Sequence, residues 1–138
     1  MPQNYNAARR LNRKERRSLD VRIGFFEGLV RRDPDDVEFL ELLGDAYSQR
    51  GDTQLGLSVD EQLCRLQPHN PRSYYNLACS YSLSGQINLA VLALERAIAL
   101  GYRDFKWLAA DPDMEPMRRH PLFRELEAKI RRITLQVT

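Results

Sequence analysis

The sequence predicts an all-α fold, a short solenoid of about seven helices paired into antiparallel hairpins. Residues of the same type recur 34 positions apart, and such a period is typical of stacked helical hairpins. Apolar residues also recur at helical spacing inside each repeat, and hardly any segment alternates as a strand would. Four pairs show the period: Pro34 and Pro68, Leu43 and Leu77, Tyr47 and Tyr81, and Gly51 and Gly85.

The composition limits the class of protein. The chain has 138 residues, which suits a single domain that buries roughly two thirds of its unfolded surface. No apolar run approaches the ~20 residues of a membrane-spanning helix, and the N-terminus lacks the apolar core of a signal peptide. Cys64 and Cys79 have no metal-ligand spacing, so we expect both to be reduced and structural. These features favour a cytoplasmic protein.

Charge is distributed unevenly along the chain. Residues 1–32 hold nine Lys and Arg against three Asp and Glu, a net charge of +6, whereas the other 106 residues hold twelve basic and sixteen acidic side chains, a net charge of −4. We therefore expect residues 1–14 to form a flexible basic arm on a mildly acidic body. The basic residues in and just after this arm are Arg9, Arg10, Arg13, Lys14, Arg16 and Arg17.

A single capping helix is expected at residues 15–33, at the start of a folded domain that covers 15–138. Counted back from Pro34, it occupies the place of the second helix of a repeat, while the place of the first helix lacks apolar residues. Half a repeat would therefore cover the exposed side of the first full repeat. Its apolar stripe consists of Leu19, Ile23, Phe26, Leu29 and Val30.

The first full repeat is predicted at residues 36–69. Its helices are expected at 36–50 and 53–67. Asp35 or Asp36 can accept hydrogen bonds from the free amides at the start of the first helix. Gly51 permits the left-handed backbone that closes this helix.

The second full repeat is predicted at residues 70–103, with helices at 71–84 and 87–101. Asn70 is a suitable N-terminal cap, and Gly85 lies in the turn between the two helices.

A C-terminal capping unit is expected at residues 104–138. Asp111-Pro112-Asp113 should end a short helix, and a last amphipathic helix should begin near His120-Pro121.

This pattern resembles the tetratricopeptide repeat, in which each repeat is one helical hairpin. The resemblance is nearly complete over residues 71–102 and extends to the preceding repeat. It implies a concave groove, lined by the first helix of each repeat, on which a peptide or protein segment of a partner docks. The matching residues of the second repeat are Tyr74, Leu77, Ala78, Tyr81, Gly85, Ala90, Leu94, Ala97 and Leu100.

The resemblance places three acids, Glu38, Glu41 and Asp45, on one helix face of the groove, where they favour a basic or amphipathic segment. The alternative is that these acids only solvate an exposed helix. Some similar proteins grip the C-terminal carboxylate of chaperones. Here Glu41 and Asp45 replace the lysine and asparagine used for this grip and would repel a carboxylate, so chaperone binding is not expected. The expected peptide-binding residues are Glu38, Glu41, Asp45, Gln49, Arg72, Tyr75, Asn76, Cys79 and Ser82.

Catalytic and metal-binding patterns are missing from the sequence. His69 and His120 each lie beside a proline in a turn, where helix capping explains them. The Asp111-x-Asp113 pair lacks the further oxygen ligands of a calcium loop. The chain has no glycine-rich phosphate loop and no nucleophile elbow. We therefore expect no enzyme activity, no metal and no cofactor.

The expected function is that of a non-catalytic adaptor for protein–protein interaction. The rival interpretation is binding of nucleic acid or an anionic surface through the basic arm, with affinity that falls steeply with salt. No aromatic residues interleave the segment from Arg9 to Arg17, so base stacking has no support. Three roles stay open for the arm: phosphate binding, occupation of its own acidic groove, and a tail that only adds solubility.

Overall fold

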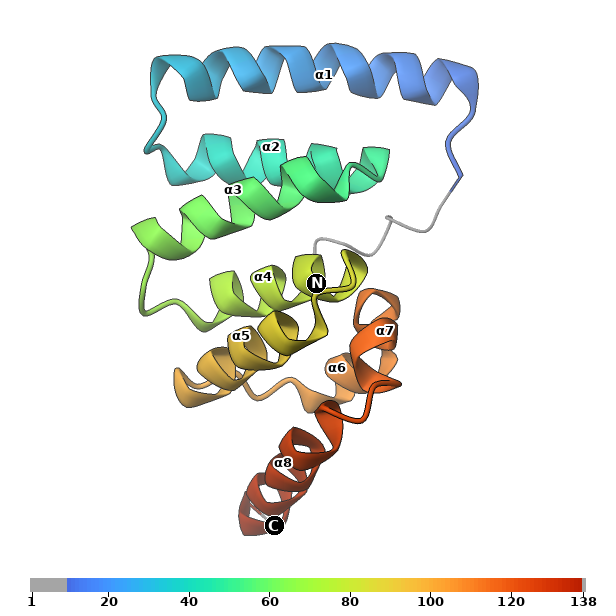
Figure 1. Cartoon of the computed structure of the whole chain (residues 1–138). Helices are drawn as coiled ribbons and strands as arrows, with labels where there is room; N and C mark the ends of the chain where they lie inside the picture. The colour runs from blue at the N-terminus through green and yellow to red at the C-terminus, as the bar shows by residue number, and fades with distance from the viewer. Residues whose placement is uncertain (1–9, 138) are drawn as a thin grey trace. The chain divides into compact units, whose positions relative to one another are not determined.

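A computed structural model describes residues 10–137, and over this range the chain is helical with no strand (Figure 1). The all-α class and the helical hairpins are confirmed. The chain divides into two compact units, residues 1–68 and 69–138. The first unit holds α1 (Arg13–Arg32), α2 (Val37–Arg50) and α3 (Thr53–Leu66). The second holds α4 (Pro71–Leu83), α5 (Ile87–Ala99), α6 (Phe105–Ala110), the 3-10 turn η2 (Pro112–Met114), α7 (Glu115–Arg118) and α8 (Phe123–Val137).

The helix ends follow the chemistry of the capping residues. Asp36 accepts a hydrogen bond from the Phe39 amide at 2.9 Å and begins α2. Asn70 does the same for the Arg72 amide at 2.9 Å and begins α4. The two hairpins turn at Gly51 and Gly85, whose φ angles of 80° and 79° lie in the left-handed region that favours glycine. The two predicted hairpins therefore form within one or two residues of their expected bounds.

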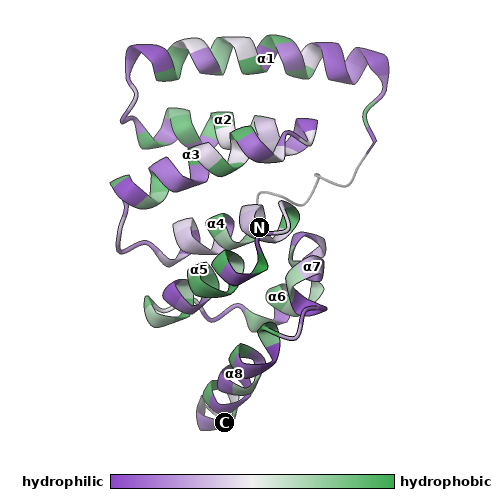
Figure 2. Cartoon of the chain, viewed as in Figure 1, coloured by the Kyte–Doolittle hydropathy of each residue, from purple (hydrophilic) through white to green (hydrophobic). Residues whose placement is uncertain are grey.

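The core of the first unit joins α1 to the hairpin of α2 and α3. Gly44 lets the two helices of that hairpin approach closely, because a Cβ atom on it would lie 3.2 Å from Cγ1 of Val59. The polar residues at the two ends of α1 stand out in Figure 2. The buried cluster consists of Leu19, Ile23, Leu40, Leu43, Ala46, Tyr47, Val59 and Leu63.

The α1 helix begins earlier than predicted. Asn12 accepts a hydrogen bond from the Glu15 amide at 2.8 Å, and the helix runs from Arg13 to Arg32. The end of the expected arm, Arg13 and Lys14, is therefore helical, because Asn12 supplies a cap that the charge pattern alone did not suggest.

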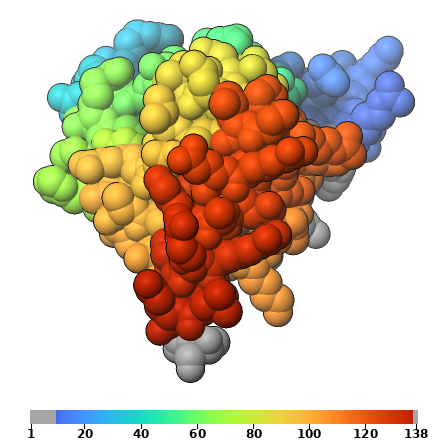
Figure 3. Space-filling view, turned by 60° about the horizontal axis from the view of Figure 1, so that its bottom comes forward, coloured from blue at the N-terminus to red at the C-terminus, as the bar shows by residue number. Residues whose placement is uncertain are grey.

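In the second unit, the chain after α5 folds back onto the hairpin of α4 and α5. The turn η2 and helix α7 pack on α4, while α7 and α8 pack on α5. Figure 3 shows this C-terminal segment, coloured orange to red, beside the yellow residues of the hairpin. Its buried side chains include Leu108, Met114, Met117, Phe123 and Leu126. The expected closing unit thus contains one more short helix than predicted, α7, which fills the stretch between η2 and α8.

Candidate functional site

The side of α2 opposite its buried residues carries an acidic stripe, which we define as Glu38, Glu41, Leu42 and Asp45. Their spacing of three and four residues keeps them on one helix face. Glu38 is exposed, Glu41 and Asp45 are half-buried, and Leu42 is 43% exposed. The stripe therefore offers a large apolar side chain among three carboxylates.

Leu42 was not among the expected binding residues. Its signal in the sequence is its position four residues after Glu38 on the same face as the three acids. An exposed leucine between carboxylates offers an apolar contact and ionic contacts to neighbouring side chains of one basic, amphipathic segment.

Gln49 lies at the end of α2 and faces α1. Its side-chain oxygen accepts a hydrogen bond from Nη2 of Arg22 at 3.4 Å. A hollow of about 400 Å³ opens beside this pair. Its lining residues are Leu11, Lys14, Glu15, Ser18, Leu19, Arg22 and Gln49.

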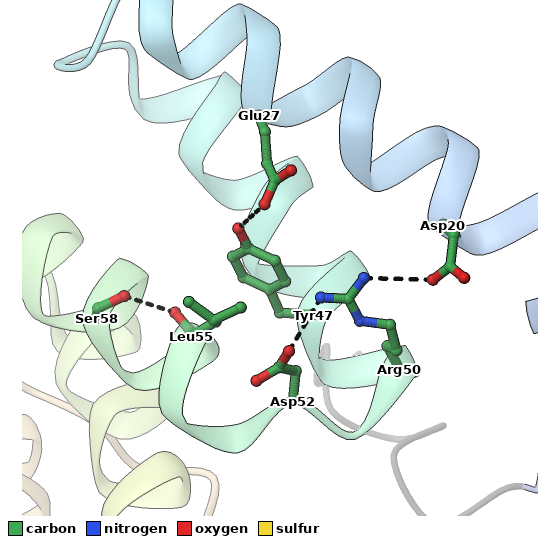
Figure 4. A network of polar contacts seen from close by, with 7 residues as sticks. All are labelled: Asp20, Glu27, Tyr47, Arg50, Asp52, Leu55 and Ser58. Atoms are coloured by element: carbon green, nitrogen blue, oxygen red, sulfur yellow. Dashed lines mark hydrogen bonds and ion pairs between the residues drawn. The ribbon is translucent and has the colours of Figure 1, made fainter.

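Two of the three acids of α1 are engaged with α2 (Figure 4). The hydroxyl of Tyr47 donates to Glu27 at 2.5 Å, and Arg50 bridges Asp20 at 3.3 Å and Asp52 at 3.0 Å. Burial, and then the hydrogen bond to Glu27, raises the pKa of Tyr47 above its ordinary value. These bonds join α1 to α2.

In the second unit, three expected binding residues lie inside the protein. Tyr75, Cys79 and Ser82 are 3%, 1% and 0% exposed, so the expectation that they line an open groove is wrong for these three side chains. Arg72 is exposed on the first turn of α4, and Asn76 is half-buried. Peptide binding by Arg72 and Asn76 stays a prediction.

The C-terminal segment accounts for this burial. The Tyr75 hydroxyl donates to Oδ2 of Asp111 at 2.6 Å, and its ring stacks on Tyr102 with centroids 4.4 Å apart. The hydroxyl of Ser82 accepts from the Met117 amide at 3.2 Å. Burial, followed by the neighbouring Cys79 and Asp111, raises the pKa of Tyr75.

Asp111 and the polar side chains of α4 thus serve structure. Asp111 is 1% exposed and also accepts from the Asp113 amide at 3.0 Å, which supports the interpretation of this segment as a helix stop. His120 accepts from the Leu122 amide at 3.2 Å, in keeping with its predicted capping role. Repeat periodicity could not indicate the contact between Tyr75 and Asp111, because Tyr75 lies in a repeat and Asp111 lies in the C-terminal segment, which does not repeat.

Four of the six basic residues predicted in and just after the arm lie on the surface of α1. Arg13, Lys14, Arg16 and Arg17 are exposed on the first turns of α1, and Arg10 is exposed just before it. Arg9 lies outside the described residues. Binding of an anionic partner by this set stays a prediction.

The remaining reactive groups are enclosed. Cys64 and Cys79 are buried and form no disulfide, and burial together with Asp60 raises the pKa of the Cys64 thiol to about 12. Within residues 10–137 there is no group of three or more His, Cys, Asp or Glu side chains placed to hold a metal ion. None of the helices in the described part of the chain is long and apolar enough to cross a membrane.

Comparison with known proteins adds a family and several relatives. Residues 71–100 match the family model of the tetratricopeptide repeat. A stretch of 52 residues, 38% of this chain, is 44% identical to a chloroplastic protein of Arabidopsis thaliana and covers 16% of that protein. A stretch of 77 residues, 56% of this chain, is 35% identical to the "Peroxisomal targeting signal receptor" of Candida albicans and covers 13% of it. The receptor of the same name from Komagataella phaffii is 33% identical over 92 residues, which are 65% of this chain and 16% of that protein. The chain therefore spans less than a fifth of the length of these curated relatives.

Proposed function

Because the chain is a tetratricopeptide-repeat protein, we propose that it is a non-catalytic interaction module that binds a basic, amphipathic segment of a partner protein on the acidic stripe of α2. The observation that carries this proposal is the exposure of Leu42 among Glu38, Glu41 and Asp45. Carboxylates attract and orient a basic segment, and the leucine gives it an apolar contact.

The partner segment is short in this proposal. The stripe covers two turns of one helix, which is enough for a few side chains of a peptide and too little for a large flat interface. Two relatives bear names that describe receptors for a targeting signal, which is in keeping with recognition of a short segment. We further propose a cytoplasmic setting, where the buried thiols of Cys64 and Cys79 stay reduced.

Charge reversal on the stripe tests this function. In the double variant Glu38→Lys/Glu41→Lys, lysines should repel a basic peptide at positions where carboxylates attracted it. The probe is a fluorescein-labelled amphipathic peptide of lysines and leucines, and its affinity is measured by fluorescence polarisation at low and at physiological salt. The double variant should lose most of the binding that the wild type shows, with the larger difference at low salt.

The matched control is Glu125→Lys/Glu127→Lys on α8, which changes the net charge by the same amount at two exposed acids of the second unit. This control should bind the peptide as the wild type does. Equal affinity of all three proteins would show that the stripe is not the site. Tighter binding of duplex DNA than of the peptide, lost on Arg13→Glu/Arg17→Glu, would favour the anionic-partner alternative instead.

A further inference from the structure

The side of α1 that faces away from its buried residues leaves large apolar side chains in solvent. Val21 is 71% exposed and Phe25 is 63% exposed, whereas Leu19 and Ile23 on the opposite side are 1% and 2% exposed. We define the outer face of α1 as Lys14, Ser18, Val21, Phe25, Gly28 and Arg32, which follow one another at intervals of four and three residues.

The 34-residue period indicates what normally covers this face. Phe25, Val59 and Ala93 occupy equivalent positions of three successive second helices. Val59 and Ala93 are 6% and 7% exposed, and Val59 packs toward Gly44 on the first helix of its own hairpin. Phe25 stands at this position without such cover. By this equivalence, Phe25 occupies the position at which a second helix contacts the first helix of its own hairpin.

Within residues 10–137, close packing does not explain two glycines on this side of α1. A Cβ atom on Gly24 or Gly28 would meet no atom within 4 Å, although glycine is disfavoured relative to alanine in the interior of a helix. Glycine is favoured where another backbone comes close. Beside them lies a shallow hollow of about 390 Å³, lined by Gly24, Phe25, Gly28, Leu29, Arg31 and Arg32.

The charge around this face is strongly positive. α1 holds seven Lys and Arg and three Asp and Glu, a net charge of +4. Asp20 and Glu27 are engaged with Arg50 and Tyr47 of α2. Cations therefore flank the apolar centre at both ends, with Lys14 toward the start of the helix and Arg32 at its end.

This charge distribution argues against a second copy as the occupant. Two α1 helices placed side by side in antiparallel orientation would bring Lys14 and Arg17 of one against Arg31 and Arg32 of the other, and in parallel orientation they would oppose like residues. Either arrangement places like charges together, which disfavours the pair.

We propose that the outer face of α1 is a second docking site, which binds an amphipathic helix with acidic flanks from a partner protein. The helix takes the place of the first helix of a hairpin, which the described residues do not supply to α1. Its apolar seam covers Val21 and Phe25, its backbone approaches Gly28, and its carboxylates meet the cations at the two ends. This partner has the opposite charge to the one proposed for the acidic stripe, so the two sites are tested independently.

The test uses a synthetic helical peptide of about 14 residues, four helical turns, with a leucine seam flanked by glutamates. An isomer of the same composition, in which the leucines are distributed around the helix and form no seam, is the peptide control. Wild-type protein should bind the glutamate peptide and not the isomer. Phe25→Glu should weaken this binding about tenfold or more, as expected for a central aromatic contact. Leu92→Glu, at a leucine that is 60% exposed on α5, should leave the affinity unchanged.

Gly28→Ala separates a docking face from a merely exposed helix. Alanine should raise the melting temperature, because it favours the helix and has room, and it should weaken peptide binding by holding the second backbone away. A higher melting temperature with unchanged affinity would overturn the proposal. Equal effects of Phe25→Glu and Leu92→Glu on the affinity for the glutamate peptide would also overturn it. The same holds if wild-type protein binds both peptides equally or binds neither. Sedimentation that shows a wild-type dimer dissociated by Phe25→Glu would assign the face to a second copy instead.

Discussion

Gly44 and Gly56 lie in the two helices of one hairpin, yet a methyl group at the two positions meets different surroundings. A Cβ atom on Gly44 would lie 3.2 Å from Cγ1 of Val59, which is tighter than normal packing. On Gly56 the nearest atom would be Cβ of Tyr47 at 3.9 Å, an ordinary contact. Close packing thus explains glycine at 44 and does not explain it at 56, where the second repeat has Ala90.

Alanine should therefore have opposite effects at the two positions. Gly56→Ala should stabilise the protein by up to about 1 kcal/mol, the difference in helix propensity. Gly44→Ala gains the same propensity but overpacks a filled core, which typically costs about 1–3 kcal/mol, so a net loss is expected. Urea unfolding followed by far-UV circular dichroism measures both free energies of unfolding. An increase of similar size for the two variants would contradict this account.

Tyr75 makes stability depend on alkaline pH. Its pKa is raised in the folded state by burial and by its neighbours Cys79 and Asp111, whereas an unfolded tyrosine titrates near ~10. The protonated side chain therefore stabilises the fold fully below pH ~10, and this contribution is lost as the pH rises above that value toward the folded-state pKa.

We expect the free energy of unfolding to fall above pH ~10, by up to about 1.4 kcal/mol per pH unit for each such tyrosine. Tyr75→Phe should be less stable at neutral pH, because Asp111 loses a buried donor, but its decline with pH should be shallower by about one proton. Urea unfolding at a series of pH values from about 8 to about 11, on both sides of the unfolded tyrosine pKa of ~10, measures how the free energy of unfolding changes with pH. Identical slopes in the two proteins would show that Tyr75 ionises equally in both states.

At the level of elements, the half-repeat pattern predicts that α1 caps the first repeat, and this stays a prediction. Leu19 and Ile23 are buried in the cluster that includes Leu40 and Leu43 of α2. Deleting residues 1–32 removes both side chains, and each buried aliphatic side chain contributes about 1.5–3 kcal/mol. The deletion should therefore lower the melting temperature strongly, as measured by circular dichroism.

A shorter truncation is the control. Deleting residues 1–9 leaves Asn12, the N-cap of α1, in place and should leave the melting temperature nearly unchanged. Equal losses of stability in the two truncations would contradict the division between arm and cap.

Periodicity predicted the hairpins well because their determinants are local. Caps, glycine turns and apolar stripes act within a few residues, and Asp36, Asn70, Gly51 and Gly85 take the expected roles. The burial of Tyr75, Cys79 and Ser82 was not predicted. Tyr75 bonds to Asp111, which lies 36 residues away and outside the repeat, so no periodic signal could show this contact.

For the molecule as a whole, the sequence predicts one folded domain over residues 15–138, and the chain divides into its two units at the boundary between the two repeats. In repeat proteins each repeat is stabilised by its interfaces with its neighbours, so a substitution that destabilises one repeat also destabilises the next. The prediction is therefore that the two units unfold together, in one cooperative transition.

Trp107 permits a direct test of this prediction, because it is the one tryptophan of the chain and lies in α6 of the second unit. Leu19→Ala removes a side chain that is 1% exposed in the first unit and should cost about 2–5 kcal/mol. If the domain is cooperative, the urea midpoint measured by Trp107 fluorescence should fall by the same amount as the midpoint measured by far-UV circular dichroism. Leu94→Ala in α5 provides the reciprocal case, since it should shift both signals equally from the other unit. A fluorescence midpoint that stays at its wild-type value in Leu19→Ala, while the circular dichroism transition splits in two, would mean that each unit is a separate folding domain.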